Sequence, residues 1–384
     1  ITVRVCHTDL ADSRWFTGSG IYRKAYLVVE EQVHAVWNGV AFNVSRADEQ
    51  SAAVCADAEI VNELDERVIG TLTASLKLCG SDEESVVFAR VPAAMEAHEK
   101  KTFYLNGMIG KPKLWSCESP SLYELCISFE KEDENVIVLD KERVGIRTFS
   151  FDADQGFFLN GKLTKFKGVC NHHDLGPLGG AVNDAAIRRQ IRILKDMGCN
   201  AIRTSHNMPA PELVEACDEM GMMLMVESFD EWKSAKMANG YHKIFDEWVE
   251  KDLTNLIRHY RNNPSIVMWC IGNEVPDQWN GNNGPKLSRM LQDICHREDP
   301  IRPVTQGMDA PDAVVNNNMA AVMDVAGFNY RPHKYPENYK KLPQQIILGS
   351  ETASTVSSRG VYKFPVIRQA MKKYDDHQSS SYDV

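Results

Sequence analysis

The sequence lacks a long hydrophobic run, since no apolar stretch approaches the roughly 18 residues that a membrane-spanning helix needs. Basic residues are also in deficit, because 43 Lys and Arg stand against 53 Asp and Glu and give a formal net charge of -10 at pH 7. Nucleic acids and anionic membranes attract basic surfaces. The sequence therefore argues against both as partners and predicts no membrane span.

Paired cysteines are absent too. The ten cysteines are scattered and include no CxxC pair, so neither a zinc ribbon nor a thioredoxin motif is indicated. Several of them, such as Cys199, Cys217 and Cys270, fall inside apolar patterns typical of small core residues. This usage favours a reducing, cytoplasmic compartment slightly over the periplasm. The chain begins at Ile1 with neither Met nor a signal peptide, so we expect a trimmed start and the targeting is left open.

The composition that remains is that of a globular protein, with 43% hydrophobic and 25% charged residues. A chain of 384 residues exceeds one ordinary core, so we expect two or three domains. Short alternating runs separated by polar turns fill residues 48–147 and predict about seven strands of a small β-sandwich. No cluster of reactive side chains lies in this part, which we interpret as a spacer.

From residue 148 strands alternate with helices, which predicts a parallel sheet. Seven strand candidates lead up to Glu351, and no eighth follows. A closed (β/α)8 barrel needs eight strands, so we expect a barrel without its last strand and a chain truncated at both ends. An open edge would expose a strand and much core, so we expect the native chain to continue past Val384.

The stretch around which the rest is organised is Ser265–Pro276. Within it, Ile266–Ile271 is an apolar run long enough for one buried strand and too short for a buried helix, and Asn273 and Glu274 follow it. A carboxylate and an amide at the carboxyl end of a buried parallel strand occupy the place where barrel enzymes carry their chemistry. The alternative, a helix N-cap or a surface acid, is the default for an isolated Asn-Glu pair.

Polar side chains follow the other strand candidates in the same way. They are His172 and His173, Arg203 and His206, Glu227 and Asp230, Asn329 and Tyr330, and Glu351. Strands four and seven of a closed barrel approach each other across its mouth, so Glu274 and Glu351 are expected to face each other. Two carboxylates about 5 Å apart perform retaining glycoside hydrolysis. The pattern thus indicates a glycosidase site at the rim of the barrel.

A series of motifs makes this interpretation specific. They are Ser19-Gly20-Ile21-Tyr22-Arg23, Gly145-Ile146-Arg147-Thr148, Gly156-Phe157-Phe158-Leu159-Asn160-Gly161-Lys162, Lys167-Gly168-Val169, Arg203-Thr204-Ser205-His206 and Ile271-Gly272-Asn273-Glu274. In order and spacing they resemble glycoside hydrolase family two, which contains β-galactosidases, β-glucuronidases and β-mannosidases, and most of all a bacterial β-galactosidase. The resemblance covers nearly the whole chain. It implies a multidomain β plus α/β architecture: the C-terminal part of a jelly-roll sugar-binding domain in 1–47, an immunoglobulin-like β-sandwich in 48–147 and an incomplete (β/α)8 TIM barrel in 148–384.

The resemblance makes Glu274 the general acid/base and Glu351 the nucleophile, and the chemistry of their neighbours agrees. The acid must stay protonated near neutral pH, which apolar neighbours and a second carboxylate favour. The nucleophile must be ionised, and Arg203, with Tyr330 as a hydrogen-bond donor, could hold Glu351 so. Asn273 would hold the sugar 2-hydroxyl.

Further sugar-binding side chains are expected around these groups. They are His172 and His206, which resemble the family's hydroxyl ligands, the rim acid Asp230, Asp12 from the first domain, and Trp232 and Trp15, which offer apolar faces to a pyranose. For Trp15 an anchoring role beneath a turn is an equal alternative. For His173 and Glu227 a structural role within the barrel is an equal alternative.

A metal site is the alternative use of the histidines. His172, His173, Asp174 and His206 come together at two neighbouring strand ends, as metal ligands could. Adjacent residues on a strand point in opposite directions, however, which argues against His172 and His173 as a pair. Some family members hold magnesium beside the acid/base through a Glu and a His after the third strand, but residues 229–233 contain no His. We therefore expect no metal and no cofactor.

These observations lead to one main hypothesis and two alternatives. The main hypothesis is a retaining exo-β-glycosidase that hydrolyses terminal β-D-galactosides by double displacement with Glu274 and Glu351, a carbohydrate being its substrate. A β-glucuronidase of the same family is the first alternative, since the segment that would recognise a uronate lies, by resemblance, beyond Val384. A non-catalytic carbohydrate-binding relative or inactive fragment is the second. The sequence leaves the oligomeric state open, a homo-oligomer included.

Overall fold

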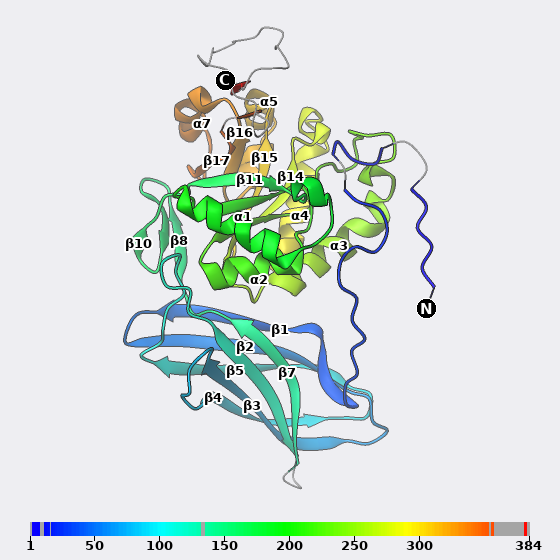
Figure 1. Cartoon of the computed structure of the whole chain (residues 1–384), viewed down its shortest axis with the longest axis vertical. Helices are drawn as coiled ribbons and strands as arrows, with labels where there is room; N and C mark the ends of the chain where they lie inside the picture. The colour runs from blue at the N-terminus through cyan, green and yellow to red at the C-terminus, as the bar shows by residue number, and fades with distance from the viewer. Residues whose placement is uncertain are drawn as a thin grey trace.

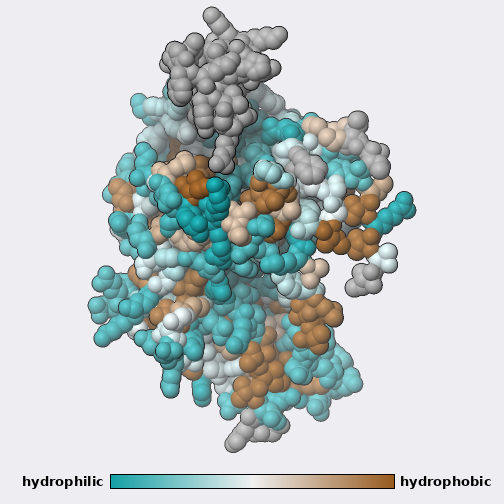
Figure 2. All heavy atoms as spheres, viewed as in Figure 1, coloured by the Kyte–Doolittle hydropathy of each residue, from teal (hydrophilic) through white to brown (hydrophobic). Residues whose placement is uncertain are grey.

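The computed structural model describes residues 2–7, 11–15, 17–131 and 135–352, and the backbone of 355–356 and 380–381. A β-sandwich lies below a body of parallel strands and helices, and the N-terminal segment runs from the sandwich up along the side of that body (Figure 1). Hydrophilic residues cover most of the face seen in Figure 2, with separate hydrophobic patches between them. None of the described helices is long and apolar enough to cross a membrane. None of the cysteines in the described part of the chain forms a disulfide.

Two antiparallel sheets form the sandwich, as predicted. The three-stranded sheet has the order β1-β2-β5, with β1 at Val33–Ala47, β2 at Ser51–Asn62 and β5 at Lys100–Gly110. The four-stranded sheet has the order β4-β3-β6-β7, with β4 at Val86–Met95, β3 at Val68–Leu78, β6 at Tyr123–Lys131 and β7 at Val136–Val144. Buried and half-buried residues alternate along the whole of β2, because successive side chains of a strand point to opposite faces. The inward-facing side chains of both sheets pack into one core.

The sandwich begins earlier than predicted. Its first strand, Val33–Ala47, is paired with β2 along most of its length. The boundary expected after residue 47 is therefore wrong. The change in the sequence at that point marks a tight turn, in which Asp48 Oδ1 accepts hydrogen bonds from the backbone N–H groups of Gln50 and Ser51. The described residues before Val33 form no helix or strand.

A small antiparallel sheet covers the amino end of the parallel body. Its strands are β8 (Phe149–Asp152), β9 (Gly156–Leu159) and β10 (Lys162–Leu163). Phe157 and Leu159 of β9 pack into one buried cluster with Met223 and Val267, which lie at the beginning of two strands of the parallel sheet. Apolar side chains fill this end of the body, so a polar site belongs at the opposite end.

The parallel sheet has seven described strands in chain order, which confirms the predicted alternation of strands and helices. The strands are β11 (Gly168–His172), β12 (Ala201–Ser205), β13 (Met223–Glu227), β14 (Ile266–Asn273), β15 (Val304–Met308), β16 (Ala326–Asn329) and β17 (Ile347–Glu351). The helices are α1 (Asp184–Asp196), α2 (Pro211–Met220), α3 (Phe245–Tyr260), α4 (Gly284–Glu298), α5 (Pro311–Asn316), α6 (Met319–Val322) and α7 (Tyr335–Lys341), with 3-10 turns η1 (Gly176–Leu178), η2 (Tyr241–Lys243), η3 (Pro276–Trp279) and η4 (Pro332–Lys334). A last antiparallel pair joins β18 (Thr355–Val356) to β19 (Ser380–Ser381). Parallel strands in chain order with helices between them are the arrangement of a TIM barrel.

Local sequence accounts for the helix ends. Asn183 precedes α1, and its side chain accepts a hydrogen bond from the backbone N–H of Ala186. α2 begins at Pro211, where no backbone N–H is needed, and is followed by Gly221 with a φ of 70°. A Cβ at Gly221 would collide with the carbonyl of Cys117, so glycine is required there for space as well as for conformation.

Buried hydrogen bonds fix the sandwich to the barrel. Arg147 is buried and donates from Nε to the carbonyl of Pro264 at 2.6 Å and from Nη2 to that of Ile266 at 2.7 Å. The side chain of Asn262 bonds to the backbone of β1. These contacts meet at the beginning of β14, all of whose residues are buried. The strand that ends at the predicted site is therefore held rigidly from its other end.

Candidate active site

Both predicted catalytic carboxyl groups lie at the carboxyl end of the parallel sheet. Glu274 directly follows β14, and Glu351 is the last residue of β17. Glu274 has a φ of 43°, a left-handed conformation that few residues other than glycine adopt, and its N–H donates to the carbonyl of Gly307 at 2.7 Å. The backbone therefore turns out of the strand at Glu274. Strained conformations of this kind are often found at functional sites.

A continuous set of hydrogen bonds joins the two carboxyl groups. Asn329 Nδ2 donates to Glu274 Oε1 at 3.0 Å and to Asn273 Oδ1 at 2.9 Å. Asn273 Oδ1 also accepts from Arg203 Nη2 at 3.0 Å, and Arg203 Nη1 donates to Glu351 Oε1 at 2.6 Å. The structure thus brings Asn273, Arg203 and both glutamates together in one network.

Glu351 is held in its charged form. Burial alone would raise the pKa of its carboxyl, but the charge of Arg203 and the hydrogen bonds from Tyr330 and Arg203 outweigh burial and hold that pKa below the ordinary value. The Tyr330 hydroxyl donates to Oε2 at 2.7 Å. The backbone N–H of Tyr330 also donates to the carbonyl of Glu351, which fixes the two residues to each other.

Glu274 is shifted in the opposite direction. Burial raises the pKa of its carboxyl, and the negative charges of Asp309 and Glu351 add to the effect, against the hydrogen bond from Asn329. The surroundings therefore raise the pKa of one carboxyl group of the pair and lower that of the other. Neighbouring carboxyl groups whose environments push their pKa values apart can serve as acid and nucleophile.

A buried ion pair between Arg203 and Glu227 lies beneath Glu351. Arg203 is 4% exposed and Glu227 is 0% exposed, and Arg203 Nη2 lies 2.6 Å from Glu227 Oε2. Glu227 Oε1 lies 2.7 Å from Nδ1 of His206 and fixes the orientation of that ring. An unpaired charge at this depth would be costly, so Glu227 compensates Arg203 and orients His206 from beneath the site.

Aromatic rings form a wall beside the network. The rings of His172 and His206 lie 5.0 Å apart, edge to face. Trp15, from the N-terminal segment, lies 4.9 Å from the ring of His172 and 5.5 Å from that of His206. His173 points away from this group, with its ring 5.5 Å from Tyr22. The two adjacent histidines are thus separated.

Asp230 is the centre of a second charged group at the rim. Its Oδ1 accepts from Arg14 Nη2 at 2.6 Å, Lys236 Nζ at 2.8 Å and Asn273 Nδ2 at 3.0 Å, and its Oδ2 accepts from Arg14 Nε at 3.0 Å. Burial alone would raise the pKa of Asp230, but these hydrogen bonds and the charge of Lys236 lower it to about 2. Oδ2 can accept one more hydrogen bond, which a substrate hydroxyl could donate. The contact of Asp230 with substrate stays a prediction.

The prediction that Trp232 offers a face to the sugar is wrong. Its side chain is 0% exposed and belongs to the core of the barrel. Indole Nε1 donates to the carbonyl of Ile271 at 2.8 Å, and a Cβ at Gly272 would lie 2.9 Å from that nitrogen. Trp232 therefore supports the end of β14 from inside, and its faces are covered by protein.

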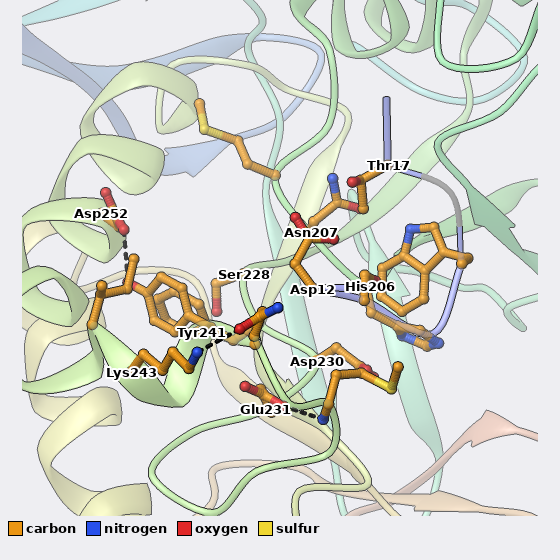
Figure 3. Close-up of a pocket in the computed structure, with 18 of the residues that line it drawn as sticks. Asp12, Thr17, His206, Asn207, Ser228, Asp230, Glu231, Tyr241, Lys243 and Asp252 are labelled. Atoms are coloured by element: carbon orange, nitrogen blue, oxygen red, sulfur yellow. Dashed lines mark hydrogen bonds between the residues drawn. The ribbon is translucent and has the colours of Figure 1, made fainter. Parts of the chain in front are cut away.

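A cavity of about 580 Å³ lies beside the network (Figure 3). Its walls come from the N-terminal segment, including Asp12, Ser13, Trp15 and Thr17, and from the barrel loops, including His206, Asn207, Asp230, Tyr241 and Lys243. Figure 3 shows Asp12 and His206 on one side of it and Tyr241 and Lys243 on the other. The cavity shares His206 and Asp230 with the groups described above, so it lies next to the catalytic candidates. Asp12 reaches it from the first part of the chain.

The described residues contain no group of three or more His, Cys, Asp or Glu side chains that could hold a metal ion. Glu231, the acid in the segment considered for magnesium, is bound by protein instead. Its Oε2 accepts from the backbone N–H of Lys236 at 2.6 Å, and its Oε1 accepts from the backbone N–H of His242 at 2.8 Å and lies 2.9 Å from Nδ1 of that ring.

Arg14 and Lys236 belong to the site and were missed by the sequence reasoning. Both lie in irregular segments, where no strand end or helical spacing marks a position. Arg14 is also 216 residues from its partner Asp230 along the chain. The available signal was weak: Arg14 lies beside Trp15 and Asp12, which were already candidates, and Lys236 follows Asp230 in the same loop.

Comparison with known proteins gives a consistent result. The model of the TIM barrel domain of glycosyl hydrolases family 2 matches residues 153–383, and a further model of the same family matches residues 37–147. Beta-galactosidase BoGH2A of Bacteroides ovatus is 36% identical over 98% of this chain and 48% of its own length. A beta-glucuronidase of Bacteroides fragilis is 26% identical over 92% of this chain and 49% of its own length. The chain thus spans about half the length of these curated relatives.

Solved structures agree with this fold. A glycosyl hydrolase family 2 member from Bacteroides cellulosilyticus DSM 14838 has a TM-score of 0.79 at 33% identity, over 91% of this chain and 46% of that protein. A beta-glycosidase from Bacteroides vulgatus has a TM-score of 0.76 at 36% identity, over 91% of this chain and 42% of that protein.

Proposed function

Because the chain belongs to family 2 of the glycosyl hydrolases, we propose that it carries the active site of a retaining exo-β-glycosidase that hydrolyses terminal β-D-galactosides. The observation that carries the proposal is the opposite pKa shift of two carboxyl groups that one hydrogen-bond network joins at the carboxyl end of the sheet. The pKa of Glu274 is raised, chiefly by burial, and that of Glu351 is lowered against burial by Arg203 and Tyr330. Double displacement needs one carboxyl group as a proton donor and another as an ionised nucleophile, and these opposite shifts suit the two roles.

In the first step Glu351 attacks the anomeric carbon, and the bond from that carbon to the aglycone oxygen breaks. Glu274 gives its proton to the departing oxygen, so a covalent glycosyl ester of Glu351 and a free alcohol result. As the ester forms, Glu351 loses the negative charge that Arg203 and Tyr330 stabilise in the free enzyme. Their hydrogen bonds at 2.6 and 2.7 Å also fix the attacking carboxylate in place.

In the second step Glu274, now a carboxylate, takes a proton from a water molecule. That water attacks the anomeric carbon from the face opposite Glu351 and releases the carboxylate, which restores both groups. Two inversions leave the product with the configuration of the substrate. The hydrogen bond from Asn329 to Glu274 at 3.0 Å keeps the acid/base oriented through both steps.

Asn273 is proposed to bind the 2-hydroxyl of the sugar. Both lone pairs of its Oδ1 are used by Arg203 and Asn329. One hydrogen of Nδ2 goes to Asp230, and the other faces His206 Nε2 at the long distance of 3.3 Å. That second hydrogen can turn to a sugar hydroxyl at small cost, which would place the 2-hydroxyl between Asn273 and the nucleophile.

Galactose is the proposed sugar because the relative with 36% identity over 98% of this chain is a beta-galactosidase. A β-glucuronidase is the second candidate, supported by a putative beta-glucuronidase of Formosa agariphila that is 32% identical over 94% of this chain. A non-catalytic carbohydrate-binding role is opposed by the intact network around both carboxyl groups. A protein that only binds carbohydrate would need neither an ionised nor a protonated glutamate at these positions.

Hydrolysis of a panel of 4-nitrophenyl β-glycosides by the full-length protein tests the proposal. We expect the β-galactoside to have the highest kcat/KM, and the variant Glu351→Gln to lose hydrolysis of every substrate in the panel. Highest activity on the β-glucuronide would support the second candidate. Absence of hydrolysis throughout, with binding of the sugars retained, would support the non-catalytic role.

A further inference from the structure

We propose that Asp230, Lys236 and Arg14 form a charged clamp that positions Asn273 and Glu274, and that Lys236 is a positioning residue of the reaction. The proposal rests on the proposed function, in which Glu274 is the acid/base. We call these three residues the Asp230 clamp. It draws on the loop after β13, which carries Asp230 and Lys236, and on the N-terminal segment, which carries Arg14, and it contacts the end of β14.

Lys236 grips the backbone in front of Glu274. Its Nζ donates to the carbonyl oxygen of Asn273 at 2.6 Å and to Asp230 Oδ1 at 2.8 Å, and its side chain is only 9% exposed. Asp230 Oδ1 in turn accepts from Asn273 Nδ2 at 3.0 Å. Asn273 is thus held at its carbonyl by the cation and at its amide by the anion of one ion pair.

This grip acts on the peptide that leads into the left-handed residue. Glu274, with a φ of 43°, stays in its conformation only if its surroundings hold it there. The N–H of Glu274 is bound by the carbonyl of Gly307, and the carbonyl on the other side of the same peptide is bound by Lys236. Both ends of the peptide between Asn273 and Glu274 are therefore fixed, and with them the direction of the Glu274 side chain.

The loop that carries Lys236 is built to present it. Glu231 Oε2 accepts from the backbone N–H groups of Lys236, at 2.6 Å, and Met237, at 3.3 Å. Glu231 Oε1 binds the backbone N–H of His242, further along the same loop. A side chain ordered in this way loses little entropy when it makes its contacts, so the buried ammonium is preorganised.

Arg14 closes the clamp from the N-terminal segment. Its guanidinium binds both oxygens of Asp230, at 2.6 and 3.0 Å, and its Nη1 lies 3.8 Å from Glu274 Oε2. Two cations thus share one carboxylate and leave a net positive charge beside the acid/base. The barrel receives this charge from a part of the chain that precedes the sandwich.

The positive charge of Lys236 and Arg14 favours the ionised form of Glu274, which the second step of the proposed reaction requires. The charged groups facing Glu274 are Asp309 after β15 and Glu351 on β17, which raise its pKa, and Lys236 and Arg14, whose positive charges oppose that rise. The two cations hold the pKa of Glu274 below the level that burial and the two acids alone would set, which favours the carboxylate that the second step needs. The clamp thus opposes the groups that favour the protonated acid of the first step, as an acid/base that changes its protonation state requires.

The test is the pH dependence of kcat/KM for the aryl β-glycoside that the full-length enzyme hydrolyses best. In Lys236→Met we expect a fall of about 10- to 100-fold, the scale on which small misplacement of a catalytic group acts. We also expect the basic limb, which reports Glu274 in the free enzyme, to move to higher pH. Lys236→Arg, which keeps the charge, should return the limb toward its original position.

Lys233→Met is the matched control, because Lys233 lies in the same loop, is 48% exposed and pairs with Asp246 at the surface. It should change neither the rate nor the limb. Arg14→Gln should move the limb in the same direction as Lys236→Met but less, since Arg14 is 40% exposed. Its control is Arg4→Gln, an exposed position of the same segment.

A loss of rate in Lys236→Met with an unmoved basic limb would overturn the proposal, because a merely structural role has that result. If Lys236→Met fails to fold, Arg14→Gln decides by the same criterion. Failure of the proposed function is recognised separately: Glu274→Ala would then give no β-glycosyl azide in the presence of azide. A fixed limb together with that product would reject the clamp alone.

Discussion

The guanidinium of Arg203 binds the carboxylate of Glu351 through Nη1 at 2.6 Å, and only 4% of the arginine is exposed. Exposed ion pairs are worth little because water and salt screen them, whereas a pair at this depth keeps most of its attraction. The same guanidinium is neutralised from below by Glu227. The ionisation of Glu351 is thus set within the protein and should depend little on ionic strength.

Removal of the guanidinium is expected to move the acidic limb of kcat/KM. Glu351 must be ionised to attack, and Arg203 lowers its pKa, so Arg203→Met should raise that pKa and shift the acidic limb to higher pH. The rate at the optimum should fall by roughly 100- to 1000-fold, the scale for loss of one preorganised electrostatic contact. Steady-state kinetics across pH measures both effects.

Arg203→Met also removes the arginine that compensates the charge of the buried Glu227, to which His206 stays bonded, and this should destabilise the fold by about 3 to 5 kcal/mol. The double variant Arg203→Met/Glu227→Gln removes the orphaned charge and should recover most of that loss without recovering the acidic limb. Arg46→Met, at an arginine whose side chain is 81% exposed, is the control for the substitution itself. An acidic limb that stays in place, with activity retained, would show that Arg203 does not set the ionisation of Glu351.

Tyr330→Phe should act in the same direction with a smaller effect. The substitution keeps the ring and removes only the hydroxyl that donates to Glu351 Oε2 at 2.7 Å. A hydrogen bond to a charged group contributes about 1.5 to 3 kcal/mol, so a fall of kcat/KM of roughly 10- to 100-fold is expected, with the acidic limb moved upward. Melting temperatures of the variant and wild type should be nearly equal, because no charge is left unpaired.

A prediction on stability concerns the groove between sandwich and barrel, lined by Asp140 and Glu142 of β7. Burial, and then the charge of Asp140, raise the pKa of the half-buried Glu142 to about 7. Its folded-state pKa lies above the unfolded value, so its contribution to stability is fully present at low pH and is lost as the pH rises to about 7. Glu142→Gln should therefore stabilise the protein at pH 8 by about 1 to 2 kcal/mol and have no effect near pH 4.

Unfolding in urea at the two pH values measures this difference. Glu84→Gln, at an exposed glutamate, is the control and should leave stability unchanged at both. Equal stability of Glu142→Gln and wild type at pH 8 would mean that Glu142 ionises in the folded protein as easily as in the unfolded chain.

The sequence predicts those parts of the structure that a local pattern can mark. A buried strand followed by a polar residue is such a pattern, and it led to the prediction of Glu274 and Glu351, which lie at the ends of two strands of one parallel sheet. Trp232 shows the limit: an aromatic residue near a strand end looks the same whether it faces the ligand or the core. Only packing against Gly272 decides that it lies inside.

Contacts between distant segments have no local pattern at all. Arg14 meets Asp230 because the N-terminal segment crosses from the sandwich to the barrel rim, a path that its own residues do not encode (Figure 1). Strand β1 was likewise assigned to the wrong domain, because a turn beginning at Asp48 and a domain boundary have the same polar composition. Prediction from sequence therefore found the two proposed catalytic carboxyl groups more readily than the side chains, such as Arg14, that surround them.

The last prediction separates the roles of the two glutamates. In Glu274→Ala the first step still proceeds for dinitrophenyl glycosides, since their leaving groups need little protonation, whereas poor leaving groups should slow by roughly 100- to 10,000-fold. The glycosyl ester on Glu351 then accumulates because no base activates water. Added azide needs no base, so it should relieve the block and give a β-glycosyl azide by a second inversion.

In Glu351→Ala no glycosyl ester can form, and azide entering the space of the lost carboxylate should attack directly and give the α-glycosyl azide. Asn329→Ala is a useful companion, because it removes the hydrogen bond at 3.0 Å to Glu274 while leaving both carboxyl groups, and should slow the reaction without producing either azide. The anomeric configuration of the product, read by NMR, is the measurement. The same anomer from both alanine variants, or the two anomers exchanged, would mean that the roles of Glu274 and Glu351 are assigned wrongly, because each anomer records which face of the sugar the surviving carboxylate occupies.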